Sequence, residues 1–264
     1  MNIIENSQNR IYKYDTAVSI VIPLYNEEAN ISAQVEELRN CLIPSLQQFE
    51  ILLIDDGSSD QTAEIIDSLS TKLADTTAIH HADNYGQSRA IHTGATAAQF
   101  SWVISIDGDR QYDPADILKL ISTLEEYSQV NPQIEKVVIM GKRLYRQDSF
   151  FKRLSSKLAN NIRQWILKDY NHDTGCSLKL FRREDFLQLP YFDHMHRFLP
   201  ALFQRQGTHM ISLGVNHRAR QAGISKYGFW NRFGVGIIDL FGVFWLIKRY
   251  RQAEIRGISE TKEE

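Results

Sequence analysis

Two aspartates separated by one glycine end an apolar run in the stretch ISIDGDRQYDP. Asp107 and Asp109 are followed at the same alternate spacing by Gln111 and Asp113. Carboxylate and amide oxygens suit hard cations such as Mg²⁺ and Mn²⁺, which take few protein ligands and share the rest of their shell with substrate phosphates. The pattern therefore predicts a Mg²⁺ or Mn²⁺ site built from Asp107, Asp109 and Gln111.

A helix start explains only part of this pattern. Asp113 is a candidate N-cap, and Pro114 is favoured in the first turn of a helix. Asp107 and Asp109 precede that cap, and their carboxylates would repel one another without a cation. For these two aspartates a metal site is therefore the better interpretation.

Two further acidic stretches, PLYNEE at 23–28 and IDDGSSDQT at 54–62, follow apolar runs earlier in the chain. An aspartate at the end of a strand can accept hydrogen bonds from a nucleobase, and an aromatic ring such as Tyr25 can stack on it. Each stretch alone would be explained as a turn, because D-G-S-S is a common loop sequence. Together with the D-G-D stretch they predict a nucleotide site.

The elements that must position these loops alternate between strand and helix. Apolar, β-branched runs predict strands at 17–23, 50–56, 77–81 and 102–109, and helical spacing predicts helices at 27–42, 58–74 and 86–99. This alternation indicates an α/β fold with a mostly parallel sheet flanked by helices. Ligands bind at the carboxyl ends of the strands in such sheets, so the acidic loops should meet in one crevice.

The second half of the chain is less regular. It predicts strands at 136–143 and 209–218, a long amphipathic helix at 149–168, and a final apolar segment with a charged tail. No internal repeat, low-complexity stretch or linker divides the chain. We therefore predict one large domain over 17–228, a C-terminal helix over 229–251 and a tail over 252–264.

Composition and charge narrow the class of protein. With 43% hydrophobic and 23% charged residues, the chain has the composition of a soluble protein with a substantial core. Residues 1–141 contain 8 Lys and Arg against 21 Asp and Glu, whereas residues 142–264 contain 22 against 11. The acidic half is suited to a metal, and the basic half to phosphates or an anionic membrane. Three cations, Arg153, Lys157 and Arg163, are expected on the solvated surface.

Neither cysteine lies in a spacing typical of metal sites. Cys41 and Cys176 are therefore expected to be buried thiols in a reducing compartment. The first fifteen residues are polar, so no signal peptide is predicted.

The loop stretches VSIVIPLYNEE, LLIDDGSSDQT, NYGQSRAIHTG and ISIDGDRQYDP resemble the nucleotide-sugar domain of family 2 glycosyltransferases, which have the GT-A fold. Further along, GKR, HDTGCSLKLFRRE, HRFLPAL and RARQAGISKYG resemble the polyprenyl-phosphate branch of that family, which includes dolichol-phosphate mannose synthase. The resemblance covers roughly residues 17 to 235. The Q-x-x-R-W signature of processive polysaccharide synthases does not occur.

The resemblance implies roles for individual residues. On the donor side it implies contacts with the nucleoside and its base from Pro23, Tyr25, Glu27, Ile54 and Asp56. The metal and diphosphate motif corresponds to Asp107, Asp109 and Gln111, with Gly108 where alanine is usual. For the phosphates and the reacting centre it implies Arg143, Asp173, Arg220, Ser225 and Lys226.

The implied reaction is a metal-dependent, inverting transfer of a sugar from a GDP- or UDP-sugar to a polyprenyl phosphate. That acceptor is already ionised near neutral pH, so a strong general base is less necessary than usual. No nucleic acid partner is implied. Two alternatives are a GT-A glycosyltransferase with a soluble glycan acceptor and a nucleotide-binding module without catalysis. The absence of G-x-G-x-x-G disfavours a Rossmann-type module.

The apolar segment at 233–247 has 15 residues, including Asp239, and is too short to cross a bilayer. Basic and aromatic residues flank it, which is typical of a helix lying in the headgroup region of an anionic membrane. The predicted membrane face consists of Phe233, Ile237, Leu240, Phe244 and Ile247. The protein is thus expected to be peripheral at the cytoplasmic face of a bacterial inner membrane. The alternative is a core helix or an interface between subunits of a homo-oligomer.

Overall fold

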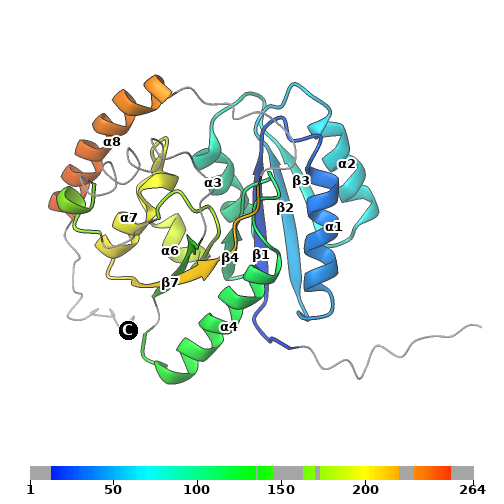
Figure 1. Ribbon diagram of the computed structural model, residues 1–264, viewed down its shortest axis with the longest axis horizontal. Helices are drawn as coiled ribbons and strands as arrows, with labels where there is room; N and C mark the ends of the chain where they lie inside the picture. Colours follow the sequence, from blue (N-terminus) through cyan, green and yellow to red (C-terminus); the bar gives the residue numbers. More distant parts are fainter. Residues whose placement is uncertain (1–12, 135, 145–162, 170–172, 220–228, 251–264) are drawn as a thin grey trace, which may run out of the picture.

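A seven-stranded sheet with the order β3-β2-β1-β4-β6-β5-β7 forms the centre of the protein (Figure 1). The computed structural model describes residues 13–134, 136–144, 163–169, 173–219 and 229–250, with the backbone alone for 229–235. Neighbouring strands are parallel, except that β6 is antiparallel to β4 and β5. The strands are β1 (Val18–Leu24), β2 (Phe49–Asp55), β3 (Thr76–His80), β4 (Trp102–Ser105), β5 (Val137–Arg143), β6 (Lys179–Arg182) and β7 (His209–Val215).

Helices cover both faces of the sheet, as predicted for an α/β fold. One buried cluster joins the sheet to α1 (Ile31–Leu42), α2 (Thr62–Lys72) and α4 (Ala115–Val130). The other cluster contains residues of α3 (Gln87–Ala97), α6 (Arg183–Leu187), the 3₁₀ turn η2 (Met195–Arg197), α7 (Leu199–Arg205) and α8 (Phe229–Arg249). Along β1, Val18, Ile20, Ile22 and Leu24 lie in the first cluster and Val21 lies in the second, so the strand is buried on both faces.

The parallel strands bring the predicted loops to one edge. Leu24 pairs with Asp55 at the ends of β1 and β2, and Val21 pairs with Ser105 at the end of β4. The amide of Asp56 donates to the Leu24 carbonyl at 2.8 Å, which continues the ladder by one residue. The acidic loops after β1, β2 and β4 therefore begin side by side, as the alternation of elements predicted.

Two elements differ from the prediction. The fourth strand ends at Ser105 rather than 109, because the Asp107 amide donates to the Ser177 hydroxyl at 3.2 Å instead of to a neighbouring strand. Strand β6 was not predicted, although it lies within the stretch HDTGCSLKLFRRE. By inserting between β4 and β5, it brings the residues before it to the edge where the acidic loops begin.

The expected surface position of Arg163 is wrong. Its side chain is buried, and its guanidinium donates to the Asp169 carboxylate at 3.0 Å. A buried guanidinium requires such a partner because burial strongly disfavours an isolated charge. Arg153, Lys157 and most of the predicted helix at 149–168 lie outside the described residues. Of the two thiols, Cys176 is buried and Cys41 is only half-buried.

Helix α8 is apolar on two sides and lies across the molecule from α1 and α2 (Figure 1). Leu240 and Val243 pack in the cluster with α7, and Ile247 packs against it, so Leu240 and Ile247 do not belong to an outward face as predicted. Two residues of the predicted face, Ile237 and Phe244, are exposed, and the side chain of Phe233 lies outside the described residues. The most exposed apolar side chains of the helix are Ile238, Phe241 and Trp245, with 73%, 61% and 58% of their surface accessible. None of the described helices combines the length and apolarity needed to pass through a bilayer.

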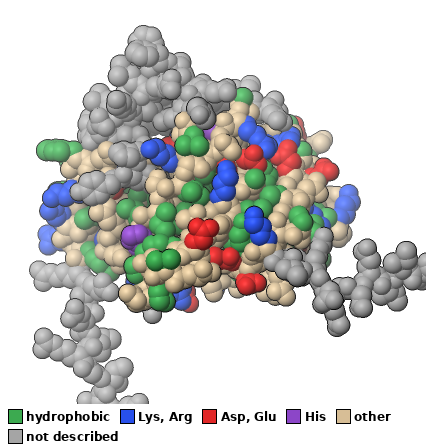
Figure 2. Space-filling view, turned by 60° about the horizontal axis from the view of Figure 1, so that its bottom comes forward, with side chains coloured by type: hydrophobic (Ala, Val, Ile, Leu, Met, Phe, Trp, Pro, Cys, Tyr) green, Lys and Arg blue, Asp and Glu red, His purple; other side chains and the backbone are tan. Residues whose placement is uncertain are grey.

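The opposite net charges of the two halves of the chain do not form separate regions on every face. Figure 2 turns the lower edge of the molecule towards the viewer, and there acidic and basic side chains are mixed with apolar ones. That face therefore does not carry charge of one sign.

Candidate active site

The loops after β1 and β2 are held together by reciprocal hydrogen bonds. The Asn26 amide donates to the Ser58 hydroxyl at 2.9 Å, and the Ser59 amide donates to the Asn26 side chain at 2.7 Å. The Glu27 amide donates to the Thr62 hydroxyl at 2.8 Å. The two acidic stretches thus form one cross-linked wall of the site.

The residues predicted to contact the nucleoside do not all face the open edge. Pro23, Tyr25 and Glu27 are half-buried at the end of β1, where a ligand can reach them. The Ile54 side chain is fully buried in the cluster with α3, which leaves it no surface for a base. The structure therefore brings the first three together and leaves Ile54 in the core.

Asp56 is buried and receives three hydrogen bonds. The amides of Tyr85 and Gly86 donate to it at 3.0 and 2.7 Å, and His81 Nδ1 donates at 2.7 Å. Its carboxylate thereby fixes the connection that leads into α3. A carboxylate has about four lone-pair positions, so one further donor, such as a base, can still be accepted.

One glycine is required where this connection approaches the loop after β2. Gly57 has φ +67°, and a Cβ there would lie 2.5 Å from the Asp83 carbonyl carbon. Only glycine takes up that backbone without strain. The D-G-S-S sequence is thus needed for the close approach as well as for the turn.

The predicted metal loop is held from three directions. Asp107 Oδ1 accepts a hydrogen bond from Gln87 Nε2 at 2.7 Å, and its carbonyl accepts one from Gln34 Nε2 at 2.7 Å. Asp109 is buried, and its Oδ1 accepts from the Gln111 amide at 3.2 Å. The fold therefore directs the carboxylates of two neighbouring aspartates into one small volume.

The electrostatics of this loop fit a divalent cation. Burial, and after it the negative charge of Asp109, raise the pKa of Asp107 to about 6, and the positive charges of Lys179 and Arg143 oppose this only in part. Both causes disfavour a second negative charge in this loop, and a bound cation would offset them. Among the described residues no three His, Cys, Asp or Glu side chains form a metal cluster, so Gln111 and donor phosphates would have to complete the shell.

Gly108, between the two aspartates, faces the core rather than the open edge. A Cβ at this position would lie 2.5 Å from Leu24 Cδ2. Leu24 is fully buried, so an alanine here would require that side chain to move. The glycine in place of the usual alanine is therefore matched to Leu24 in this chain.

Arg143 and Asp173 form a bidentate ion pair. Arg143 Nε and Nη2 donate to the two carboxylate oxygens at 2.8 and 2.6 Å, and the Arg143 amide donates to Oδ2 at 3.1 Å. Burial works against the charged guanidinium, but the hydrogen bonds and charge of Asp173 outweigh it, so the pKa of Arg143 is raised. Asp173 therefore orients Arg143, which is a different use of its carboxylate from acting as a base.

Several residues that surround this site were not predicted from the sequence, among them Gln87 and Lys179. Gln87 lies in the quoted stretch NYGQSRAIHTG, but an uncharged side chain there gave no signal of its contact with Asp107. Lys179 is buried in β6, where its Nζ donates to the Cys176 carbonyl. Burial lowers the pKa of Lys179, and the nearby Cys176, Asp107 and Asp173 oppose that change. Because β6 itself was not predicted, no local pattern marked Lys179 as a buried residue.

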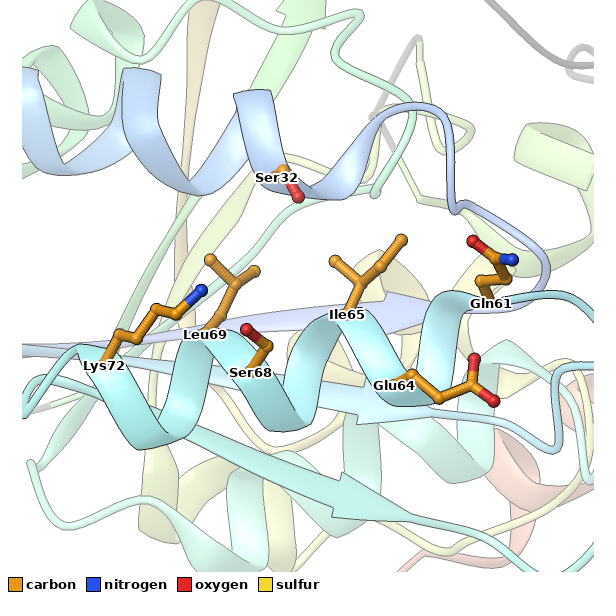
Figure 3. A pocket seen from close by; sticks show the side chains of 7 residues that line it. All are labelled: Ser32, Gln61, Glu64, Ile65, Ser68, Leu69 and Lys72. Carbon is orange, nitrogen blue, oxygen red and sulfur yellow. The ribbon is translucent and has the colours of Figure 1, made fainter.

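The remaining predicted residues, Arg220, Ser225 and Lys226, lie outside the described part of the chain. A separate hollow lies between α1 and α2 (Figure 3). It contains none of the predicted site residues. Its lining is Ser32, Gln61, Glu64, Ile65, Ser68, Leu69 and Lys72.

The chain is similar in sequence to bacterial proteins named as a synthase and a transferase of polyprenyl-phosphate sugars. A dodecaprenyl-phosphate galacturonate synthase from Rhizobium johnstonii is 31% identical over 237 residues, which cover 88% of this chain and 67% of that protein. An undecaprenyl-phosphate 4-deoxy-4-formamido-L-arabinose transferase from Aeromonas hydrophila subsp. hydrophila is 33% identical over 213 residues, covering 80% of this chain and 63% of that protein. The chain thus spans about two thirds of the length of these relatives.

Comparison with solved structures gives the same fold at low identity. A glucosyl-3-phosphoglycerate synthase from Mycobacterium tuberculosis, crystallised with Mn²⁺, UDP and glucosyl-3-phosphoglycerate, has a TM-score of 0.64 at 15% identity. The alignment covers 88% of this chain and 80% of that one. This likeness confirms the predicted GT-A α/β fold. Residues 19–189 match the family model itself, and on this match and the 31% identical relative the chain belongs to glycosyl transferase family 2.

Proposed function

We propose that this glycosyltransferase moves a sugar from a nucleotide-sugar to a polyprenyl phosphate in a metal-dependent, inverting reaction. The observation that carries the proposal is the pair of crowded carboxylates, Asp107 and Asp109, beside the oriented guanidinium of Arg143. The two relatives are named as a synthase and a transferase of polyprenyl-phosphate sugars, and that acceptor class is extended here to this chain.

The bond changes need no proton transfer. An oxygen of the acceptor phosphate forms a bond to the anomeric carbon of the sugar. The bond from that carbon to the donor's β-phosphate oxygen breaks, and the nucleoside diphosphate leaves with the electron pair. Since the phosphate is already ionised, catalysis depends mainly on stabilising the charge on the leaving group.

The chain's own residues would provide that charge stabilisation and the orientation. Asp109 and Gln111, with Asp107 beside them, would hold Mg²⁺ or Mn²⁺, which as a Lewis acid would stabilise the leaving diphosphate. Arg143, locked by Asp173, would bind phosphate oxygens through N–H groups that the ion pair leaves available. Arg220, Ser225 and Lys226 are assigned to the phosphates on the basis of their motif.

The donor side would use the cross-linked loops. Tyr25 would stack on the base, with Pro23, Glu27 and Asp56 around the nucleoside, and the backbone of Gly108 would face the donor. The proposed donors are GDP- or UDP-sugars. Because the Ile54 side chain is buried, it would contribute only by packing beneath the site.

Helix α8 would hold the site near the membrane that contains the acceptor. Its exposed apolar residues Ile238, Phe241 and Trp245 are followed by Lys248 and Arg249, a combination that suits the headgroup region of an anionic leaflet. The proposed location is peripheral, at the cytoplasmic face of the inner membrane.

A lipid-extraction assay tests the function. The protein is incubated with Mn²⁺, undecaprenyl phosphate and a panel of labelled UDP- and GDP-sugars. Label is expected in the lipid phase with one donor, and none is expected with undecaprenol, which lacks the phosphate. Transfer only to a soluble glycan, or no transfer with any donor, would contradict the proposal.

A further inference from the structure

The side chain of Gln111 is oriented by a neighbouring segment of the main chain. Gln111 Nε2 donates to the Arg218 carbonyl at 3.2 Å, and the Arg218 amide donates to the Gln111 carbonyl at 2.7 Å. A carbonyl oxygen only accepts hydrogen bonds, so the amide nitrogen must face it. This leaves Gln111 Oε1, the atom type that a divalent cation needs, directed elsewhere.

Arg218 is held in turn by two acidic side chains. Its Nη1 lies 3.1 Å from Glu37 Oε2, and its Nη2 lies 3.2 Å from Asp113 Oδ2. The other oxygen of Glu37 pairs with Arg110, the residue immediately before Gln111. Glu37, which belongs to α1, therefore binds the metal loop on one side of Gln111 and the segment that orients Gln111 on the other.

The metal loop contains a backbone conformation that needs such support. Arg110 has φ +58°, in the left-handed region that non-glycine residues seldom adopt. It lies between the proposed ligands Asp109 and Gln111, so its backbone determines how the two side chains are arranged. Strained residues of this kind persist only where surrounding contacts hold them.

We infer that Glu37 and Arg218 are positioning residues for the metal site: together they hold Arg110 and Gln111 so that Gln111 Oε1 is presented to the cation. This inference rests on the proposed function, because it takes Asp109 and Gln111 as ligands. Glu37 and Arg218 would not touch the metal themselves. Residues around the ligands of a metal typically change its affinity 10- to 100-fold when they are replaced.

A purely structural role would give a different result. The side chains of Glu37 and Arg218 are 33% and 37% exposed, and ion pairs with this exposure contribute little to folding stability. Their loss should therefore change metal affinity much more than the melting temperature. A pair that only joined α1 to the rest of the protein would show the reverse.

The test compares Mn²⁺ binding by Glu37→Gln, Arg218→Gln and the wild type. Free Mn²⁺ is followed by electron paramagnetic resonance in the presence of UDP and, separately, GDP. Each variant is expected to bind Mn²⁺ on the order of 10-fold more weakly, with a nearly unchanged melting temperature. The matched control is Asp75→Asn, which breaks the other ion pair of α1, with Arg39, and is expected to keep wild-type Mn²⁺ affinity.

A second substitution tests the strained residue directly. Glycine adopts φ +58° freely, so adding Arg110→Gly to Glu37→Gln should recover part of the lost Mn²⁺ affinity. Wild-type affinity in both single variants, or an equal loss in Asp75→Asn, would overturn the positioning role alone. A wild-type protein that binds no Mn²⁺ with either nucleotide would overturn the metal site on which the proposed function depends.

Discussion

Asp109 combines a proposed catalytic role with an electrostatic disadvantage in the metal-free protein, because its charge raises the pKa of Asp107. Asp109→Asn should therefore lower turnover about 100-fold or more, through lost stabilisation of the leaving group. The same change should raise the melting temperature of the metal-free protein, since repulsion at the loop is relieved. Turnover at saturating Mn²⁺ and thermal unfolding in EDTA measure the two effects.

The control for this prediction is Asp83→Asn, which removes one exposed carboxylate from the connection between β3 and α3, outside the metal loop. It should leave turnover and melting temperature near the wild-type values. Normal turnover in Asp109→Asn would contradict the metal assignment. A lower melting temperature in EDTA would contradict the account of repulsion.

The raised pKa of Asp107 predicts how the folding stability of the metal-free protein depends on pH. Its pKa rises from 3.8 to about 6 on folding, so between these values the folded protein keeps a proton that the unfolded chain has released. The resulting stability is fully present below pH 3.8 and is lost as the pH rises through about 6. The loss is at most about 3 kcal/mol, and smaller because the carboxyl is partly exposed.

Thermal unfolding in EDTA at pH 5 and pH 7.5 measures this loss. The melting temperature of Asp107→Asn should fall less between the two values than that of the wild type. Parallel curves for the two proteins would show that Asp107 titrates normally. Added Mn²⁺ should stabilise the wild type more at pH 7.5, because at pH 5 a proton competes for the site.

For individual residues, the sequence was informative only where functional side chains follow one another at short, regular spacing. Asp107, Asp109 and Gln111 follow one another at fixed spacing, so they could be recognised. The contact of Gln87 with Asp107 joins residues 20 positions apart, and that of Ser177 joins residues 70 apart. No local spacing encodes such contacts, because they arise from the packing of the sheet.

Among the helices and strands, α8 allows a prediction about membrane binding, because its apolar side chains Phe241 and Trp245 are exposed. Replacing Phe241 and Trp245 together by serine should weaken binding to anionic vesicles at least about tenfold, since each ring would bury apolar surface in the membrane. Vesicle sedimentation measures the change. Val130→Ser, on a well-exposed apolar side chain of α4, is the control and should bind as the wild type does.

The alternative role for α8 predicts a different outcome. If this helix joined two subunits, the double variant would change its sedimentation coefficient without vesicles and would pellet with them as before. Helical spacing found the outward face only in part: Ile237 and Phe244 are exposed as predicted, but Leu240 is buried, because α8 is apolar on more than one side. Only the structure distinguishes the side that packs on α7 from the side that carries Phe241 and Trp245.

The parallel part of the sheet was predictable because each strand is an apolar run followed by a helix with its own period. Strand β6 was not, since it has only four residues, KLFR, and its neighbours in space are β4 and β5. Nothing in a run of that length distinguishes a central strand from a loop. Its antiparallel direction also departs from the alternation that identified the others.

In the whole molecule, the order of the strands across the sheet differs from their order along the chain, which is the order of synthesis. β4 and β5 do not pair with one another, and each pairs with β6, which follows both in the chain. On the ribosome, the edge of β4 must therefore remain open until Lys179–Arg182 has emerged, although β5 is already available. An open apolar strand edge invites pairing with other chains. Nascent chains that stall before β6 should accordingly depend on chaperones more than those that stall after it.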